Sequence, residues 1–462
     1  MKPILLQYKD ITSLSGVELL NVPESIEISH IYTDSRAGKK GGFFVALTGE
    51  KFDGHDYLKE VIKNGAGAVL VAKEKAAKLV TGKTPCIVVP DTTKALGELA
   101  ALWRNKFQGR VIAITGSNGK TTTKDTLASI LGEKYRVVAT SKNYNNHIGV
   151  PMTIFEVSND DEYLVLEMGT NHPGEIEYLA EIAQPDVALI TNIGASHLEF
   201  LGTEKGVRRE KISLFKTTDK RGGTVYINID DKMLKPLTKD YDKTVLFGSR
   251  NSADVVGKIK GYDRHGFPIV KIDGPEKKFE VTLPLYGKNN GLNVLAASAI
   301  ALYEGVGKHD IMDGIKALKS PKQRLEPKEF SKGLLLDDTY NANPESMLSA
   351  FDVLRNIKTF KNKWLILGDM FELGDASSKM HQALAAPLMK IADIRVLTIG
   401  DQMYHLFKEL KRYYVPVWHA HTRETLLSNI AETDFSNSVV LVKGSRGMRM
   451  EEFVAVIMEK YK

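Results

Sequence analysis

One glycine-rich stretch carries the strongest chemical signal in the sequence. Residues 115–123 read Thr-Gly-Ser-Asn-Gly-Lys-Thr-Thr-Thr and follow the short apolar run 111–114. A strand, a glycine loop, a lysine with a hydroxyl residue and then a helix cradle nucleotide phosphates, because the loop N–H groups turn inward and the helix N-terminus adds positive partial charge. We expect Lys120 to reach the phosphates and the Thr121 hydroxyl to hold magnesium. The predicted phosphate-binding residues are Gly116, Ser117, Asn118, Gly119, Lys120, Thr121 and Thr122.

The stretch departs from the strict phosphate-loop pattern at one position. The pattern asks for a glycine five residues before Gly119, where this chain has Ile114. The alternative interpretation is a tight strand-to-helix turn that carries an exposed lysine. Because Gly-Lys-Thr-Thr comes directly after an apolar strand, we favour nucleotide binding.

Two further side chains follow apolar runs that read as buried strands. Glu167 comes directly after the run 163–166, and His197 lies a few residues past the run 187–190. The carboxyl ends of parallel strands meet at one edge of a sheet, so both side chains fall where ligands collect. A carboxylate is a natural magnesium ligand, whereas histidine is an unusual one because magnesium prefers oxygen. On the residues alone, the histidine could equally be structural.

These residues need strands and helices to bring them together. Short apolar runs alternate with helical stretches, which favours α/β structure with parallel sheets. Three textures follow one another: 1–107, 108–320 with a β-rich stretch at 224–286 and a helix at 291–303, and 321–462. We predict three α/β domains with these limits: a smaller N-terminal one, a central parallel-sheet phosphate-loop domain and a Rossmann-like C-terminal one.

Composition sets the outer bounds on function. The 462 residues suggest roughly three domains. A formal charge of +6 is small for this length, so we expect neither a nucleic-acid nor a membrane partner. The only cysteine, Cys86, excludes an internal disulfide framework and a Cys-based zinc site, and it fits a reducing compartment. Without a long apolar stretch or a signal peptide, we expect a soluble cytoplasmic protein.

Together the motifs resemble the Mur ligases, the ATP-dependent amide-bond ligases of peptidoglycan precursor synthesis. They recur in the family's order from about residue 32 to residue 451. Within the family, residues 337–347 and 367–374 are most similar to the branch that adds D-alanyl-D-alanine to UDP-N-acetylmuramoyl-tripeptide. The Asp-Asn-Pro-Arg string usual in the preceding ligase is absent here.

The resemblance implies a second magnesium ion beside the phosphates. Glu167, His197 and Lys211 would hold it, in addition to the ion at Thr121. Lys211 would either carry a carbamate formed from CO₂ or remain a plain cation. A glutamate that is common two positions further on is Ser213 in this chain.

It also implies an ATP site shared between two domains. Asn290 and Asn293 share one face of a helix start and suit hydrogen bonding to adenine, although Asn290 could equally cap the helix. Arg324 and Asp338 would approach the phosphates and the ribose when the C-terminal domain closes. The expected catalytic residues are Lys120, Lys211 and Arg324.

Substrate contacts are likewise implied in all three domains. The N-terminal domain would hold the UDP-sugar, the central domain ATP and magnesium, and the C-terminal domain the incoming dipeptide. For Lys443 the alternative is a solvated loop, and for the paired asparagines of the central domain it is a polar turn. The substrate-binding residues implied are Ser35, Arg36, Phe44, Asp53, Asn145, Asn146, Tyr340, Asn341, Asn343, Lys443 and Ser445.

The implied reaction needs no covalent enzyme intermediate. The γ-phosphoryl group of ATP passes to the tripeptide carboxylate, and the D-alanyl-D-alanine amine attacks the acyl phosphate. We expect a monomer that acts on small molecules. Three alternatives stay open: a sibling ligase with another amino-acid substrate, a phosphate-loop ATPase switch acting on a protein partner, and an inactive homologue that only binds.

Overall fold

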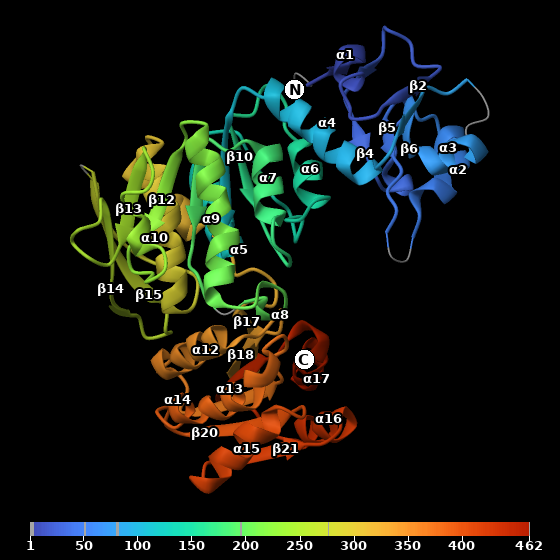
Figure 1. The fold of residues 1–462 in the computed structure, drawn as a ribbon. Helices are drawn as coiled ribbons and strands as arrows, with labels where there is room; N and C mark the ends of the chain where they lie inside the picture. Colours follow the sequence, from blue (N-terminus) through green and yellow to red (C-terminus); the bar gives the residue numbers. More distant parts are fainter. Residues whose placement is uncertain (1–3, 50–51, 80–82, 195, 276, 462) are drawn as a thin grey trace.

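The chain forms three α/β domains, each built on its own sheet (Figure 1). The computed structural model describes residues 4–49, 52–79, 83–194, 196–275 and 277–461. Within these ranges no helix is both long enough and apolar enough to cross a bilayer. The predicted α/β class and the three-domain organisation are confirmed.

The N-terminal domain holds a five-stranded sheet in the order β2-β7-β6-β5-β4. Neighbours from β4 to β7 are parallel, and β2 pairs antiparallel with β7. A small antiparallel pair, β1 and β3, lies beside it. The strands are β1 (Leu6–Gln7), β2 (Glu18–Leu20), β3 (Glu27–Ile28), β4 (Ile31–Tyr32), β5 (Phe43–Val45), β6 (Ala68–Ala72) and β7 (Cys86–Val89). The helices are α1 (Tyr8–Ile11), α2 (Leu58–Lys63), α3 (Lys73–Leu79) and α4 (Thr92–Lys106).

Helix α4 packs mainly on the central domain. Gly97 lies so close to Tyr178 that an added Cβ would overlap the phenol. The buried Arg104 donates to Ala183 O (3.0 Å) and pairs with Asp186 (3.0 Å). One apolar core therefore runs from the first sheet across α4 into the central domain.

The central domain is a nine-stranded sheet in the order β16-β15-β14-β13-β12-β11-β8-β10-β9. Along this order every pair from β14 to β9 is parallel, whereas the β14–β15 and β15–β16 pairs are antiparallel. The predicted β-rich stretch therefore extends the same sheet. The strands are β8 (Arg110–Thr115), β9 (Val137–Ala139), β10 (Tyr163–Glu167), β11 (Val187–Ile190), β12 (Thr224–Asn228), β13 (Thr244–Gly248), β14 (Val255–Tyr262), β15 (Pro268–Gly274) and β16 (Lys277–Thr282).

Helices cover both faces of this sheet (Figure 1). Helices α5, α10 and α11 enclose one apolar core, and α4, α6, α7 and α9 enclose the other. The helices are α5 (Lys120–Gly132), α6 (Gly149–Ile154), α7 (Glu175–Ala183), α8 (Leu198–Leu201), α9 (Glu204–Lys220), α10 (Lys288–Tyr303) and α11 (Lys308–Lys316).

The C-terminal domain is a doubly wound six-stranded sheet in the order β17-β18-β22-β19-β20-β21. All pairs are parallel except β17–β18. The strands are β17 (Glu326–Phe330), β18 (Gly333–Asp338), β19 (Asn362–Gly368), β20 (Ile394–Ile399), β21 (Val417–Ala420) and β22 (Ser438–Lys443). The helices are α12 (Pro344–Asn356), α13 (Ser377–Ala383), α14 (Ala385–Leu388), α15 (Met403–Arg412), α16 (Arg423–Glu432) and α17 (Glu451–Lys460).

Candidate active site

The glycine-rich loop joins β8 to α5, as the sequence predicts. Gly116 and Gly119 have φ angles of 152° and 82°, in the left-handed region. An added Cβ at Gly116 would overlap the Thr191 hydroxyl, and one at Gly119 would overlap the Asn293 amide. Both positions therefore require glycine for conformation and for space.

Lys120 is the first residue of α5 and folds back over the loop. Its ammonium donates to Gly116 O at 2.8 Å, so the alternative of an exposed turn lysine is wrong. Burial lowers its pKa, the Glu167 carboxylate opposes that shift, and the Arg324 guanidinium adds to it. Lys120 therefore lies within electrostatic reach of the Glu167 carboxylate and of a cation from the C-terminal domain.

A polar segment directly after β11 fixes the loop, and the sequence analysis did not single it out. Asn192 accepts from Asn118 N and donates to Asn118 O, both at 3.0 Å. Thr191 donates to the same carbonyl at 2.5 Å. The Ser117 hydroxyl exchanges hydrogen bonds with the Gly194 backbone. The only signal in the sequence was their place after a buried strand.

Glu167 ends β10 and is buried, with one carboxylate oxygen engaged. Oε1 accepts from the Asn145 amide at 2.9 Å. Oε2 is shielded from solvent and has no hydrogen-bond partner among the described residues. Asn146 accepts from Ile148 N and Gly149 N at the start of α6 (3.2 and 2.9 Å), which is the polar-turn alternative. Asn145 thus orients Glu167, and Asn146 closes the polar turn that leads into α6.

Lys211 lies on α9 with its side chain 1% exposed. Among the described residues its ammonium has no hydrogen bond or ion pair. Burial and the charge of Lys120 hold its pKa well below the ordinary lysine value, although Glu210 opposes the shift. Burial in this setting disfavours the charged form of the amine.

His197 stands beside these cations on a backbone with φ 52°. Burial and the charges of Lys211 and Lys120 lower its pKa to about 4. Its Nδ1 lies 3.6 Å from the carboxylate of Glu372 in the C-terminal domain. The imidazole is therefore neutral at physiological pH, and one of its nitrogens keeps a lone pair that can bind a ligand.

Glu210 is a buried carboxylate that sequence reasoning missed. It accepts from Gly174 N (2.7 Å) and Ile176 N (2.8 Å) and so caps the N-terminus of α7. Ser213, which stands where relatives often have a glutamate, donates to Glu210 O at 2.5 Å. The acid beside Lys211 therefore comes from the preceding residue and is already committed to a helix end.

The predicted metal ligands Glu167, His197 and Lys211 lie within electrostatic reach of Lys120, but they do not form a preassembled cage. Within the described ranges there is no cluster of three or more His, Cys, Asp or Glu side chains that could hold a metal ion. The role of Thr121, Glu167, His197 and Lys211 as ligands stays a prediction.

Arg324 belongs to the C-terminal domain, and its charge acts on Lys120 of the phosphate loop. Its guanidinium lies 4.0 Å from the centre of the Tyr340 ring. The flanking residues Gln323 and Leu325 have φ angles of 61° and 50°, so this short segment is held in an uncommon backbone conformation. Tyr340 supports Arg324 in this arrangement, where the sequence analysis placed it at a substrate.

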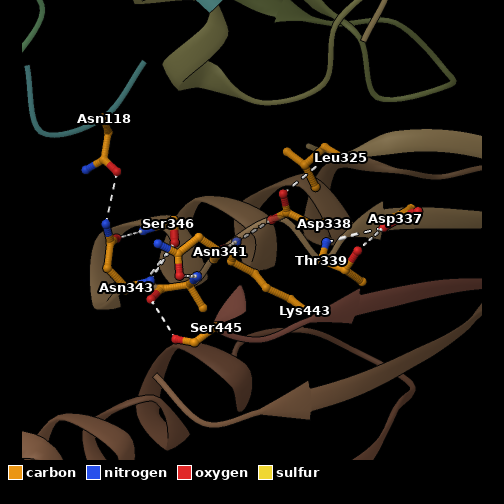
Figure 2. Close-up of polar contacts among 11 residues, drawn as sticks. Asn118, Leu325, Asp337, Asp338, Thr339, Asn341, Asn343, Ser346, Lys443 and Ser445 are labelled. Atoms are coloured by element: carbon orange, nitrogen blue, oxygen red, sulfur yellow. Dashed lines mark hydrogen bonds and ion pairs between the residues drawn. The ribbon is translucent and has the colours of Figure 1, made fainter. Parts of the chain in front are cut away.

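Asp338 and Lys443 were predicted to do separate work, but they form one buried pair (Figure 2). Their charged atoms lie 2.6 Å apart, and the Lys443 side chain is 2% exposed. Lys443 also donates to Asn341 O at 3.0 Å, and Asp338 accepts from Leu325 N at 3.1 Å. The solvated-loop alternative for Lys443 is therefore wrong, because the pair ties three strand-end segments together.

Ser445 and Asn343 are also engaged with protein groups. Ser445 is buried and accepts from Phe371 N at 2.8 Å. Asn343 caps α12 through its Oδ1, which accepts from Ser346 N at 2.8 Å. Its Nδ2 donates across the domain boundary to Asn118 Oδ1 at 3.0 Å (Figure 2).

A cleft of about 380 Å³ opens between the phosphate loop, the end of β12, α10 and α12. Two exposed leucines line it from different domains: Leu292 on α10 and Leu348 on α12. Asn293 and Asn289 supply amides on the same wall. Apolar surfaces with amides at the edge suit a planar heterocycle.

Asn290 does not take the capping role, and its contact with adenine stays a prediction. Helix α10 starts at Lys288 after Gly287, so Asn290 lies inside the first turn and does not cap it. Its amide donates to Tyr286 O at 2.7 Å, and its Oδ1 accepts from Asn293 at 3.2 Å. Asn290 therefore orients Asn293, which lines the cleft.

The predicted sugar-binding residues lie in the N-terminal domain and differ in availability. Arg36 is 86% exposed and makes a bidentate pair with Asp34 (2.9 and 2.8 Å), which lowers the pKa of that carboxyl to about 2. Ser35 begins the adjacent 3₁₀ turn. Phe44 is fully buried against Tyr32. Its side chain is therefore not exposed for the predicted contact with a ligand.

Asp53 is the centre of a turn network. It pairs with Lys75 and lies 2.6 Å from His55 Nδ1. His55 Nε2 accepts from Ala72 N at 2.9 Å, so the proton of this neutral imidazole must be on Nδ1, facing Asp53. If Asp53 binds the UDP-sugar as predicted, its carboxylate must do so while it also contacts Lys75 and His55.

Comparison with known proteins accounts for this arrangement. Three family models match: the Mur ligase family catalytic domain at residues 27–104, the Mur ligase middle domain at 114–301, and the Mur ligase glutamate ligase domain at 323–446. The UDP-N-acetylmuramoyl-tripeptide–D-alanyl-D-alanine ligase of Bacillus subtilis (strain 168) is 34% identical over 94% of each chain.

Solved structures agree over the full length. The chain resembles MurF from Acinetobacter baumannii with a TM-score of 0.87 and 32% identity, covering 99% of this chain and 100% of the other. MurF ligase from Thermotoga maritima, solved in complex with ADP, matches with a TM-score of 0.82 and 29% identity, covering 94% and 97%. The phosphate loop, its partner residues from the C-terminal domain and these full-length likenesses together show that the chain belongs to the Mur ligase family.

Proposed function

We propose that this chain is an ATP-dependent amide-bond ligase that joins D-alanyl-D-alanine to UDP-N-acetylmuramoyl-tripeptide. The observation that carries the proposal is the glycine loop with Lys120, whose ammonium is within electrostatic reach of Glu167 at the end of β10 and of Arg324 from the C-terminal domain. The named activity of the full-length relative from B. subtilis supports the choice of substrates.

The reaction proceeds in two steps. The tripeptide carboxylate attacks the γ-phosphorus of ATP, an O–P bond forms, the bridging P–O bond breaks and ADP leaves. The dipeptide amine then attacks the acyl carbon and a C–N bond forms. The C–O bond to phosphate breaks, phosphate leaves, and the amine gives up a proton. Lys120 and Arg324 neutralise the charge that spreads over the transferred phosphoryl group.

Each domain takes one part of the substrate set in this proposal. Residues 1–107 hold the UDP-sugar, for which Arg36 is an exposed cation. Residues 108–320 hold ATP, with the base in the cleft between Leu292 and Leu348. Residues 321–462 supply Arg324 and receive the dipeptide. The buried pair of Asp338 and Lys443 shapes the strand ends that face these ligands.

Magnesium fits the residues around Lys120. The unpartnered Glu167 Oε2 is a buried oxygen that a cation would satisfy, and Thr121 follows Lys120 at the helix start. His197 adds a neutral nitrogen. When bound, magnesium supplies positive charge to the phosphate oxygens.

Lys211 fits a carbamate better than a cation. A buried amine without an ion-pair partner in the described structure pays the desolvation cost of a charge with no compensation, whereas its uncharged form is a nucleophile for CO₂. The carbamate would place an anion within electrostatic reach of Lys120 and His197.

We therefore expect the wild-type protein in ¹³C-bicarbonate at pH 7.5 to show a carbamate resonance in its ¹³C NMR spectrum. The signal should vanish in Lys211→Arg, because a guanidinium stays charged. Lys124→Arg is the matched control, since Lys124 is equally buried but already pairs with Asp125 and donates to Thr140 O at 2.6 Å. A spectrum without the resonance, or one that persists in Lys211→Arg, contradicts the assignment.

The function is tested by phosphate release with both partners supplied. We expect release from ATP only when UDP-N-acetylmuramoyl-tripeptide and D-alanyl-D-alanine are both present, with one amide bond formed per phosphate. A sibling ligase would need another amino acid. An ATPase switch would release phosphate without the UDP-sugar, and an inactive homologue would release none. Each of those three results overturns the proposal.

A further inference from the structure

Both polar atoms of the Asn118 side chain bind the C-terminal domain. Its Oδ1 accepts from Asn343 Nδ2 at 3.0 Å, and its Nδ2 donates to Glu345 Oε2 at 2.8 Å. The two contacts fix the orientation of the amide, because a flipped amide would set donor against donor and acceptor against carboxylate. Both partners come from the first turn of α12.

The backbone of Asn118 is anchored to the central domain at the same time. Thr191 and Asn192 hold its N–H and its carbonyl. Glu345 also depends on this surface, since its carboxylate lies 2.6–2.9 Å from where a Cβ on Gly194 would stand. The contact therefore joins a rigid part of the phosphate loop to one end of α12.

The other end of α12 rests on apolar contacts with the central domain. Ile357 packs over Gly266, and Val353 packs over Gly287. Nearby, Phe267 stacks on Tyr286 with ring centres 4.3 Å apart. One end of the helix is thus held by two directional polar contacts and the other by side-chain packing, which tolerates rotation better.

The carboxylate of Glu345, at the polar end of α12, is unfavourable beside a phosphate-binding loop. A carboxylate beside a phosphate-binding loop repels the phosphates, and burial raises its pKa, so the group is costly in both respects. A residue that opposes nucleotide binding by charge must contribute in another way. Its bond to Asn118 is the contribution that the geometry shows.

We propose that Asn118, Asn343 and Glu345 form a latch that positions the C-terminal domain, and with it Arg324, over the phosphate loop. The inference rests on the proposed function for the identity of the nucleotide. When the latch opens, α12 turns about its packed end and Arg324 moves away from Lys120. Glu345 and Asn343 are positioning residues, because they act on ATP through the placement of Arg324.

The proposal is tested with Glu345→Ala, Glu345→Gln and Asn343→Ser. Alanine removes the acceptor, glutamine keeps an acceptor oxygen without the charge, and serine keeps a helix cap without the amide donor. Glu424→Ala is the matched control, because Glu424 occupies the corresponding second position of α16, after the Thr422 cap, and has no contact to the central domain in the described structure.

Steady-state kinetics give opposite signs for a latch and for simple charge repulsion. A latch predicts that Glu345→Ala raises the KM for ATP about 10-fold and Asn343→Ser about 5-fold, with kcat changed less than about twofold, because saturating ligands restore closure. Glu345→Gln should stay within about threefold of wild type. Repulsion alone predicts a lower KM in both Glu345 variants, which would overturn the latch.

A distance measurement without ligands separates this proposal from the function itself. Spin labels at Lys239→Cys and Lys390→Cys, both exposed positions in the two domains, report the domain separation, and the native Cys86 is buried. We expect Glu345→Ala to add a longer-distance population that is absent from wild type and from Glu424→Ala. An unchanged distribution overturns the latch even in an active ligase, whereas failure of the proposed function appears as wild-type protein that releases no phosphate.

Discussion

Replacing Lys120 with alanine is expected to lower the rate of amide formation by about 1,000-fold or more. The Lys120 ammonium is the only cation that the phosphate loop itself supplies, and its one hydrogen bond in the described structure is to Gly116 O. Removing it takes away charge that stabilises the transferred phosphoryl group and leaves the loop backbone anchored by Asn192. Single-turnover formation of the amide, measured with saturating substrates, is the direct readout.

The control for this variant is its thermal stability. Because Lys120 holds few protein groups, we expect the Tm of Lys120→Ala to fall within a few degrees of wild type, so that lost activity reports lost chemistry. Lys120→Arg keeps the charge in a different shape and should recover only part of the rate. Retention of more than a tenth of the wild-type rate by the alanine variant would place the phosphates elsewhere.

Glu167→Gln is expected to cost about 100- to 1,000-fold in kcat and to raise the magnesium concentration needed for half-maximal rate. Glutamine can still accept from the Asn145 amide in place of Oε1. At the Oε2 position, however, a buried amide donor would replace the unpartnered oxygen and would repel a cation. A titration of rate against magnesium at fixed ATP measures both effects.

Glu162→Gln provides the comparison at the opposite end of the same strand. Glu162 precedes β10 and accepts from Arg136 N at 3.0 Å, so glutamine keeps its contact while removing one charge. We expect this variant to match wild type in kcat and in magnesium dependence. If the two variants behave alike, the effect of Glu167 is a general charge effect and the predicted metal role is wrong.

Much of the fold could be predicted because it depends on local patterns. Continuous apolar runs identified the central strands of the parallel sheets, which are buried on both faces, and the glycine loop marked the junction of β8 and α5. Boundaries were less certain. Helix α10 begins three residues before the predicted start, since Gly287 precedes it with a positive φ of 91° and a Lys-Asn-Asn sequence is compatible with a first turn.

The site was predicted as a set of residues but not as a set of contacts. Lys120, Glu167 and Arg324 were found because each sits in a motif or at a strand end. The pairing of Asp338 with Lys443 joins strands that are distant in the sequence, and nothing local distinguishes a buried lysine there from a solvated one.

The residues missed share the same explanation. Asn192, Glu210 and Glu345 are ordinary polar residues after a strand or in a helical turn, and their importance comes from what they face across the fold. Conversely, Phe44 and Asn290 belong to recognisable motifs, yet the structure turns them towards protein groups. A motif identifies a neighbourhood more dependably than it identifies which side chain touches a ligand.

Helix α4 limits how this enzyme can be recombined with its relatives. It follows the first sheet in the chain, yet Trp103 and Arg104 donate to carbonyls of the central domain, and Gly97 admits Tyr178. A chimera joined at residue 107 would pair a foreign α4 with native α6 and α7, and every one of these fitted contacts would be mismatched. The better crossover lies between β7 and the cap residue Asp91, so that α4 stays in the same parent sequence as the central domain on which it packs.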